Sequence, residues 1–357
     1  MVVLGIETSC DETAAAVVEE TGDPARPWRA RSNVVASQID VHRQWGGVVP
    51  ELSARQHVRD ICGVVERALA DAGVQTCDAI AVTQGPGLAG SLLVGLSFAK
   101  AMAWARSVPL IPVHHLAGHI ESLVLEGGEM PLPAIVLVVS GGHTSLYRIE
   151  QAGVYERLGR TRDDAAGEAF DKVAKLLGLG YPGGPAIDLV AQYGDDRAVP
   201  LPKTRLTHVD RNAPDLPGLR DFSFSGVKTS VLRYVTARRG ERGLAPGDPL
   251  PRQHVSDVAA SFQRVVVEAL LDRLFDAAHA YGARSVGIAG GVSANSRLRA
   301  DALARGRSRG VPVFIPPLAL STDNAAMIAA AGLRRYRAGF VGSLDVDVDA
   351  SLVLGSG

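Results

Sequence analysis

The chain has 357 residues, of which 46% are hydrophobic and 21% are charged, so it can bury a sizeable core and is not an intrinsically disordered protein. Its length predicts two domains or one large two-lobed domain. Lys and Arg number 37 against 38 Asp and Glu, so binding to nucleic acid must depend on local basic patches. The three cysteines form no C-x-x-C pair, which argues against a disulfide framework and a structural zinc. Without a signal-like start or an apolar run of membrane-spanning length, we expect a cytoplasmic protein.

The chain begins with a strand, a polar turn and a second strand. Residues 2–6 and 14–18 are apolar and flank the turn Glu7-Thr8-Ser9-Cys10-Asp11-Glu12-Thr13. Small hydroxyl and acidic residues in such a turn can wrap a phosphate or position a metal. Taken alone, an ordinary hairpin with acidic turn residues explains this turn at least as well.

The next elements predict an α/β protein. Residues 21–50 suggest a loop with a short strand, and apolar residues at helical spacing, including Val58 and Leu69, predict a helix over residues 53–72. A strand follows at residues 78–83. The glycine-rich turn at residues 84–91 opens a helix that runs through Trp104, but it lacks the Lys-Ser/Thr ending of a P-loop. We therefore expect its glycines to serve close packing of helix against sheet.

Two histidines open the next helix. The strand at residues 108–113 leads into His115 and His119, and an i, i+4 pair on a helix shares one face. Both imidazoles can then reach one metal ion, although a surface pair or a helix cap is the alternative. Leu116 stands where an H-E-x-x-H protease has its glutamate, which argues against a protease. A third ligand must come from elsewhere, and a carboxylate is the natural candidate.

The second half of the chain repeats the opening pattern. An apolar strand over residues 134–139, a small polar turn at 140–143 and a strand over 144–149 resemble residues 4–9 and their surroundings. This similarity predicts two related lobes, each of which opens with a strand-turn-strand unit. Turns of this kind from two lobes could hold a nucleotide.

Residues 163–255 combine acidic, glycine-rich and basic stretches. A helix over residues 163–178 carries Asp171 among apolar neighbours, and a tight turn at 181–185 precedes Asp188. Residues 195–255 are polar and proline-rich. The helix that begins near Ser225 carries a local basic patch, which is either an RNA-contacting surface or a solvated face; its members are Lys228, Arg233, Arg238, Arg239 and Arg242.

The last third supplies the remaining candidates. Ser256 is expected to cap a long helix that reaches Tyr281, and a strand over residues 285–289 ends in a Gly-Gly turn before Asn295. The amide of Asn295 can both donate and accept hydrogen bonds to a ligand. After a strand at 311–315, Asp323 lies at the start of the final helix, and it is our candidate for the third metal ligand.

Together these motifs resemble one family, the tRNA threonylcarbamoyladenosine transferases, formerly called O-sialoglycoprotein endopeptidases. Each stretch is weak alone, but their order along nearly the whole chain is specific. One departure is Arg160-Thr161-Arg162, where the family more often has Gly-Glu-Ser/Thr, and another is the longer, Arg/Pro-rich tract at 236–255. The matching stretches are residues 6–13, 114–119, 139–144, 163–175, 181–185, 223–228, 290–295 and 322–327.

The resemblance implies an actin/Hsp70/sugar-kinase-like α/β fold of two RNase-H-like lobes with a helical insertion. On this basis we expect residues 1–114 plus 323–357 to form the N-terminal lobe and 115–322 the C-terminal lobe. It also implies an acyltransferase that moves the threonylcarbamoyl group of threonylcarbamoyl-adenylate to the exocyclic amine of adenosine 37. The acceptors would be tRNAs that read codons beginning with A, and AMP would be released.

The resemblance also implies roles for particular residues. His115, His119 and Asp323 would hold one metal ion per subunit, usually Fe²⁺ with zinc possible, and Glu12 is a candidate for positioning or proton transfer. The family acts with an inactive paralogue, TsaB, and a small ATPase, TsaE. The adenylate would be bound by Val138, Val139, Ser140, Gly141, Gly142, Asp171, Gly184, Asp188 and Asn295.

Three other functions compete with this interpretation. An ATP-dependent sugar- or acetate-kinase-like phosphotransferase fits two phosphate-binding turns, but it does not account for three metal-ligand side chains on separate elements. A non-catalytic nucleotide-dependent scaffold is disfavoured by the presence of His115, His119 and Asp323. A metalloprotease is disfavoured by the missing glutamate.

Overall fold

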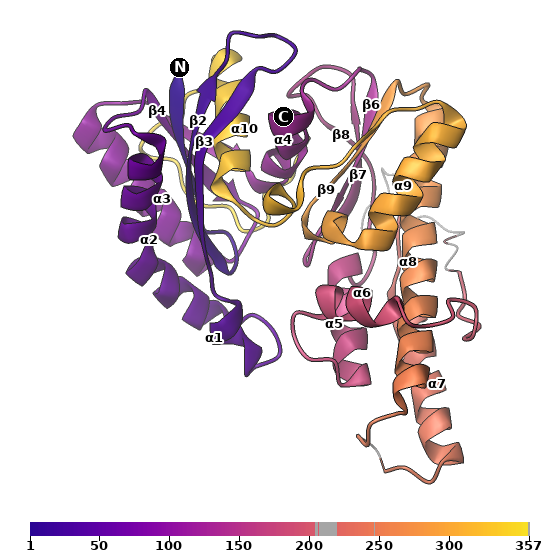
Figure 1. The fold of residues 1–357 in the computed structure, drawn as a ribbon. Coiled ribbons are helices and arrows are strands. Elements are labelled where there is room, and N and C mark those ends of the chain that lie inside the picture. Colours follow the sequence, from indigo (N-terminus) through magenta and orange to yellow (C-terminus); the bar gives the residue numbers. More distant parts are fainter. Residues whose placement is uncertain (204–205, 207–219, 246, 356–357) are drawn as a thin grey trace. The chain divides into compact units, whose positions relative to one another are not determined.

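The computed structural model describes residues 1–203, 206, 220–245 and 247–355 (Figure 1). The chain forms two compact units. Unit 1 contains Met1–Pro131, Ile149–Glu156 and Phe314–Gly357, and unit 2 contains Leu132–Arg148 and Arg157–Val313. Part of the polar, proline-rich stretch 195–255 lies outside the described residues.

Unit 1 is built on a mixed sheet of five strands. In the order β3 (Trp28–Ser37), β2 (Glu12–Glu20), β1 (Val2–Glu7), β4 (Ala79–Gly85) and β5 (Leu110–His114), neighbouring strands are hydrogen-bonded. The pairs β1–β2 and β2–β3 are antiparallel, whereas β1–β4 and β4–β5 are parallel. The carboxyl ends of β1, β4 and β5 therefore meet at one edge, where open α/β sheets place their sites.

Helices cover both faces of this sheet (Figure 1). On one face α2 (Pro50–Ala72) and α3 (Ala89–Arg106) pack on Leu4, Ile6 and the other strand residues of the same parity. On the opposite face α10 (Ala325–Arg337) packs on Val3 and its same-face neighbours, and it also contacts α4 (His115–Gly127). Because successive strand residues point to opposite faces, a continuous apolar strand supplies both cores. A short helix, α1 (Ile39–Arg43), precedes α2.

Glycines allow α10 to lie close to the strands. A Cβ atom added at Gly5 would be 2.3 Å from the carbonyl oxygen of Ala325, and one added at Gly332 would be 2.4 Å from the Cβ of Ala81. Real Cβ atoms do not approach so closely, so both positions require glycine at this helix–sheet spacing. The start of α10, next to Asp323, is thereby held against β1.

Unit 2 repeats the strand order of unit 1. Its sheet runs β8 (Glu156–Arg160), β7 (Thr144–Ile149), β6 (Ala134–Val139), β9 (Ser285–Ala289) and β10 (Val313–Phe314), and β6–β9 is parallel. Read in this direction, β6 to β10 correspond to β1 to β5, which confirms the predicted duplication. The α-helices of unit 2 are α5 (Ala166–Leu177), α6 (Gly183–Ala191), α7 (Ser225–Glu241), α8 (Arg252–Ala280) and α9 (Ser296–Arg309). A 3₁₀ turn, η1 (Gly291–Ala294), precedes α9, and a second, η2 (Leu318–Leu320), belongs to unit 1.

The units divide the chain at other positions than we expected. The expected boundary at residue 115 falls at the start of α4, but α4 belongs to unit 1, as does the stretch Ile149–Glu156. The physical reason is that α4 packs along α10, which itself lies on the unit 1 sheet. His115, His119 and Asp323 are consequently residues of the same unit.

Several local predictions were wrong in detail. Residues 28–37 form the ten-residue strand β3, whereas we expected only a short strand. In the described sheet β3 is an edge strand next to β2. Polar residues on its exposed side interrupt the apolar run that would have indicated a strand. Val58 was expected in the core but is 63% exposed. The turn predicted at 181–185 contains the first residues of α6, and α8 begins at Arg252, so Ser256 is buried within the helix instead of capping it.

None of the helices in the described part of the chain is long and apolar enough to cross a membrane.

Candidate metal site

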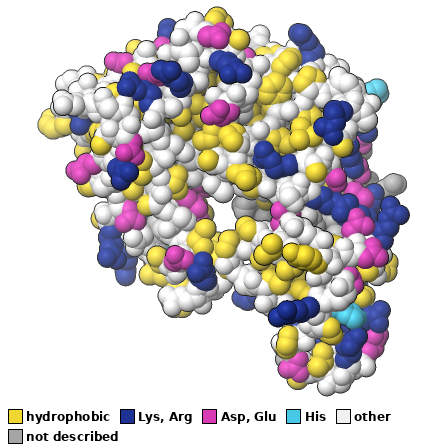
Figure 2. All heavy atoms as spheres, viewed as in Figure 1, with side chains coloured by type: hydrophobic (Ala, Val, Ile, Leu, Met, Phe, Trp, Pro, Cys, Tyr) yellow, Lys and Arg dark blue, Asp and Glu magenta, His cyan; other side chains and the backbone are white. Residues whose placement is uncertain are grey.

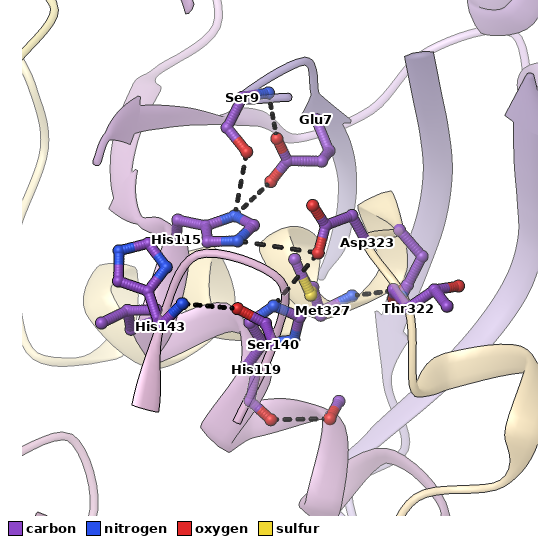
Figure 3. Close-up of polar contacts among 12 residues, drawn as sticks. Glu7, Ser9, His115, His119, Ser140, His143, Thr322, Asp323 and Met327 are labelled. Atoms are coloured by element: carbon purple, nitrogen blue, oxygen red, sulfur yellow. Dashed lines mark hydrogen bonds and ion pairs between the residues drawn. The ribbon is translucent and has the colours of Figure 1, made fainter. Parts of the chain in front are cut away.

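The three expected metal ligands converge in unit 1. His115 is the first residue of α4, His119 lies one turn later, and Asp323 lies just before the N-cap residue of α10. Their ligand atoms all lie within 4.8 Å of one another. The Nε2 atoms of His115 and His119 are 3.6 and 3.1 Å from Oδ1 of Asp323 (Figure 3). Both imidazoles are buried, whereas 20% of the Asp323 side chain is exposed.

Strand ends explain why these side chains meet. Strand β5 ends at His114, whose side chain accepts a hydrogen bond from Leu116 N at 3.1 Å and so caps α4. The helix therefore starts at the sheet edge, with His115 and His119 on its first turns. Asn324 caps α10 in the same way through Met327 N at 3.1 Å, which places Asp323 at the mouth of that helix.

A carboxylate that we did not predict as a site residue orients His115. Oε2 of Glu7 lies 3.0 Å from Nδ1 of His115, and Glu7 is fully buried at the end of β1 (Figure 3). Thr83 Oγ1 donates to the same oxygen at 2.7 Å, and Ser9 N donates to Oε1 at 2.5 Å. A carboxylate that accepts from Nδ1–H leaves Nε2 free to bind a metal, a common outer-shell arrangement in metal sites. The only sequence signal is an acidic residue directly after a buried strand.

The chemistry of the donor set fits a metal ion. Although His119 Nε2 is near Asp323, its geometry there is not that of a hydrogen bond, and both ring nitrogens of this fully buried histidine have no hydrogen-bond partner. Buried polar atoms are normally satisfied, so such a pair needs an explanation. Two imidazoles and one carboxylate are a usual catalytic set for zinc or non-haem iron, with open positions left for substrate.

The charges around the cluster are strongly coupled. Burial lowers the pKa of His115, but the carboxylates of Asp323 and Glu7 outweigh it and raise that pKa to about 9. Burial raises the pKa of Glu7, yet His115 holds it below its usual value. Burial, together with the charges of Asp323 and Asp11, raises the pKa of Glu12 well above its usual range. Because metal ligands must be deprotonated, metal binding at this cluster is expected to depend on pH.

In unit 2, the expected phosphate turn is a tight loop after β6. Val138 and Val139 are fully buried, whereas Gly141 and Gly142 are exposed. Ser140 N donates to the carbonyl of His143 at 2.8 Å, which closes the turn. Gly167 at the start of α5 packs on it, because a Cβ there would lie 2.5 Å from the Ser140 carbonyl oxygen. A turn held this way can present backbone N–H groups to an anion.

The other expected adenylate residues also lie in unit 2, and three of them have structural partners. Asp171 accepts a hydrogen bond from Gly183 N at 2.7 Å, which fixes the start of α6, and the space around the α-carbon of Gly184 is open. Asn295 caps α9 through Leu298 N at 2.9 Å and donates to Asp188 Oδ1 at 3.2 Å.

Asp188 is the centre of a hydrogen-bond network. Besides Asn295, it accepts from Gln263 Nε2 at 3.1 Å, and both the backbone N and the Oγ of Ser296 donate to its carboxylate, at 3.0 and 2.7 Å. The network links α6, α8 and the start of α9. Asp188 and Asn295 were both expected as binding residues, but the bond between them was not predicted.

The unusual Arg160–Arg162 stretch is part of the framework of unit 2. Arg162 Nε pairs with Asp221 Oδ2 at 2.8 Å; the Asp221 side chain is fully buried and that of Arg162 is 10% exposed. Arg160 N donates to the other carboxylate oxygen of Asp221 at 3.0 Å. Asp163 accepts hydrogen bonds from Phe224 N and Ser225 N, at 2.8 and 3.3 Å, and so caps α7. Arg160 and Arg162, where the chain departs from the family pattern, therefore help to hold the segment before α7.

The basic patch on α7 is partly neutralised by its neighbours. Lys228 pairs with Asp164 at 2.5 Å and Arg238 with Glu241 at 2.6 Å. Arg242 Nη2 lies 3.3 Å from the Nε2 of His254. Basic, acidic and histidine side chains mix around the free end of α7 in the space-filling view (Figure 2). Arg233 and Arg242 are exposed, and Lys228, Arg238 and Arg239 are partly exposed, so the patch is accessible to a polyanion.

Comparison with solved structures supports the fold. The crystal structure of full-length HypF in the phosphate- and nucleotide-bound form aligns with 94% of this chain and 46% of that chain, at a TM-score of 0.57 and 14% identity. HypF of T. kodakarensis aligns with 95% of this chain and 48% of its own, at a TM-score of 0.56 and 16% identity. With the duplicated strand order, this likeness identifies the actin/Hsp70/sugar-kinase-like fold.

Sequence comparison identifies the family. The family model for TsaD, tRNA N6-adenosine threonylcarbamoyltransferase, matches residues 29–330. A protein of that name from Symbiobacterium thermophilum is 51% identical, covering 99% of this chain and 97% of its own length. A protein of the same name from Salinibacter ruber is 50% identical, and the alignment covers 99% of this chain and 100% of that protein. With this similarity along its whole length, the chain belongs to the tRNA N6-adenosine threonylcarbamoyltransferase family and is a tRNA-modifying transferase.

Proposed function

We propose that this enzyme transfers the threonylcarbamoyl group of threonylcarbamoyl-adenylate to the exocyclic amine of adenosine 37 in tRNAs that read codons beginning with A. The amine nitrogen attacks the carbamoyl carbon, the bond from that carbon to the phosphate oxygen breaks, AMP leaves and the amine loses a proton. The observation that carries the proposal is the convergence of His115, His119 and Asp323 in a chain of this family. The same convergence disfavours the kinase-like alternative.

One metal ion would be held by His115 Nε2, His119 and Asp323, and we propose Fe²⁺, with Zn²⁺ as the other candidate. When bound, it supplies Lewis-acid polarisation of substrate oxygens. Glu7 would keep His115 in the tautomer whose Nε2 is free, through its 3.0 Å contact with Nδ1. Glu12, at the start of β2, is our candidate for positioning the amine or accepting its proton.

We assign adenylate binding to unit 2. The backbone of Val138 to Gly142 would hold the phosphate, a role suited to an exposed Gly-Gly turn. The open space at Gly184 allows a flat base to lie against the backbone. Asp171, Asp188 and Asn295 would bind the nucleoside, and the network around Asp188 keeps the last two in fixed positions.

Protein partners are a further part of the proposal. We propose that the enzyme works in the cytoplasm with the inactive paralogue TsaB and the ATPase TsaE. The outer sides of α2 and α3 expose apolar residues, among them Val58, Leu93 and Trp104, which are 63%, 52% and 75% exposed. Together with the neighbouring surface of these two helices, they are our candidates for a protein interface.

The test combines metal analysis with a transfer assay. Purified chain, synthetic threonylcarbamoyl-adenylate and unmodified tRNA are mixed with and without the two partners, and modified nucleoside is measured. We expect His119→Ala to lose metal and transfer activity together while it unfolds cooperatively. Full metal occupancy in this variant, or full activity after the metal is stripped from the wild type, would contradict the proposal.

A further inference from the structure

A buried ion pair joins the two helices that carry the metal ligands. Glu121 on α4 and Arg334 on α10 make two parallel bonds, Nε to Oε1 at 2.9 Å and Nη2 to Oε2 at 2.8 Å. Only 3% of the Glu121 side chain and 16% of the Arg334 side chain are exposed. The proposed reaction does not use either residue. A buried pair of this kind is weak evidence for stability, so it invites another explanation.

The relative position of these helices decides whether the ligands meet. His115 and His119 are fixed to α4, whereas Asp323 directly precedes the cap of α10. A slide of one helix along the other would change the distances from Asp323 to both imidazoles, which are now 3.6 and 3.1 Å. One helical residue corresponds to a rise of about 1.5 Å, so even a slip of that size would disrupt coordination.

The apolar contact between the helices centres on Gly118 of α4. A Cβ there would lie 2.8 Å from Cδ1 of Ile328 and 3.2 Å from Cγ of Met327, so two large side chains of α10 pack over the glycine. This contact brings the helices close together. The bidentate arginine–carboxylate pair adds a directional constraint, because it fixes both distance and orientation.

Arg334 itself is held from other sides. Nη1 pairs with Glu129 Oε1 at 2.8 Å, and the guanidinium carbon lies 5.4 Å from the centre of the Trp28 ring. Tyr155, in the segment 149–156 of unit 1, donates to Glu121 Oε1 at 3.3 Å. The guanidinium group of Arg334 is therefore held in a fixed position relative to the sheet as well as to α4.

We propose that Glu121 and Arg334 are positioning residues that set the register of α4 against α10 and so bring His115, His119 and Asp323 to metal-binding distance. This inference rests on the metal site of the proposed function. Neither residue touches the ion or the substrate.

The test removes the pair without leaving a buried charge. In the double variant Glu121→Met/Arg334→Met, apolar side chains of similar length replace both partners, a change that is often neutral or stabilising for the fold. Binding of Co²⁺ and Zn²⁺ is measured by competition titration with the full chain, and the visible spectrum of bound Co²⁺ reports the ligand geometry. Cooperative urea unfolding of the metal-free proteins is measured alongside.

The matched control is a second ion pair on the same helix. Arg337 pairs with Glu20 of β2 and its side chain is 64% exposed, so Glu20→Met/Arg337→Met removes a pair that does not involve α4. We expect the Glu121/Arg334 variant to bind both metals roughly 10- to 100-fold more weakly with an altered Co²⁺ spectrum, and the control to match the wild type.

The outcomes separate this inference from the proposed function. Wild-type affinity and spectrum in the folded Glu121/Arg334 variant would overturn the register role. Equal losses in both double variants would also overturn it, because the loss would then not be specific to the α4–α10 pair. Failure of the wild type to bind either metal would instead refute the metal site itself.

Discussion

Glu7 is predicted to control metal affinity through the tautomer of His115. The perturbation is Glu7→Gln, which keeps the shape of the side chain and removes one acceptor oxygen. In the wild type, Oε1 accepts from Ser9 N, while Oε2 accepts from Thr83 Oγ1 and His115 Nδ1. A glutamine has one oxygen, and the fixed backbone donor of Ser9 would keep it. Its NH₂ group would then face Thr83 and His115.

The substitution would reverse the hydrogen bond rather than delete it. With an NH₂ donor opposite, Nδ1 of His115 becomes the acceptor, and the proton moves to Nε2, the atom that must bind the metal. Outer-shell changes of this kind typically cost 10- to 100-fold in metal affinity, or about 1.4–2.8 kcal/mol. Thr83 can accept from the same NH₂ group, so no buried group loses its partner and stability should change by no more than about 1 kcal/mol.

Competition titration with Zn²⁺ or Co²⁺ measures the affinity, and urea unfolding of the metal-free protein measures the stability. Thr83→Val is the matched control, since it removes one donor to Glu7 and leaves the bond to His115 in place. We expect Thr83→Val to bind metal within a few-fold of the wild type. If Glu7→Gln bound metal as tightly as the wild type, or lost affinity only in proportion to lost stability, the tautomer argument would be refuted.

Three further predictions concern other parts of the chain. Gly5→Ala places a Cβ 2.3 Å from the Ala325 carbonyl oxygen, so we expect α10 to shift, with a loss of about 1–3 kcal/mol in urea unfolding and weaker metal binding. Asn295→Ser keeps a capping oxygen for α9 but loses the bond to Asp188, so calorimetry should show weaker adenylate binding at near wild-type stability and metal content; unchanged affinity would remove Asn295 from the site. The triple variant Arg238→Gln/Arg239→Gln/Arg242→Gln should bind tRNA more weakly, and its affinity should depend less on salt concentration. If a folded variant kept the wild-type slope of log affinity against log salt concentration, the α7 patch would not contact tRNA.

The sequence predicted the elements of this fold better than their edges. Buried strands such as 2–6 and 134–139 are continuous apolar runs, and the duplication was visible because both strand-turn-strand units lie at the centre of their sheets. The length of strand β3 was underestimated, because an edge strand needs apolar residues on one side only and so lacks a continuous apolar run. Val58 lies at helical spacing from residues of α2 that are buried, yet it is 63% exposed. Spacing alone does not show how much of the helix surface the sheet and its neighbours cover.

The candidate site was predictable only in part, because some of its contacts join residues that are far apart in the sequence. The pair His115 and His119 is local, because i, i+4 geometry lies within one helix, and Asp323 could be named because it opens a helix. Glu7 is brought to His115 by the parallel pairing of β1, β4 and β5, which spans more than a hundred residues of sequence. Likewise, Asp188 and Asn295 were both named, but their mutual bond depends on how α6 and α9 each pack on α8, and no local pattern records that.

The duplicated lobes show how one framework can serve two kinds of chemistry. The central strand β1 ends in Glu7, whose carboxylate is committed to His115, while its counterpart β6 ends before Ser140-Gly141-Gly142, where no side chain extends beyond a hydroxymethyl group. A buried carboxylate at the strand end orients a metal ligand. A Gly-Gly turn at the equivalent point exposes backbone N–H groups, which suit a phosphate. The difference follows from the residues at one turn, because the strand order around both turns is the same. We therefore expect unit 1 to supply the metal site of the proposed transfer and unit 2 its anion site.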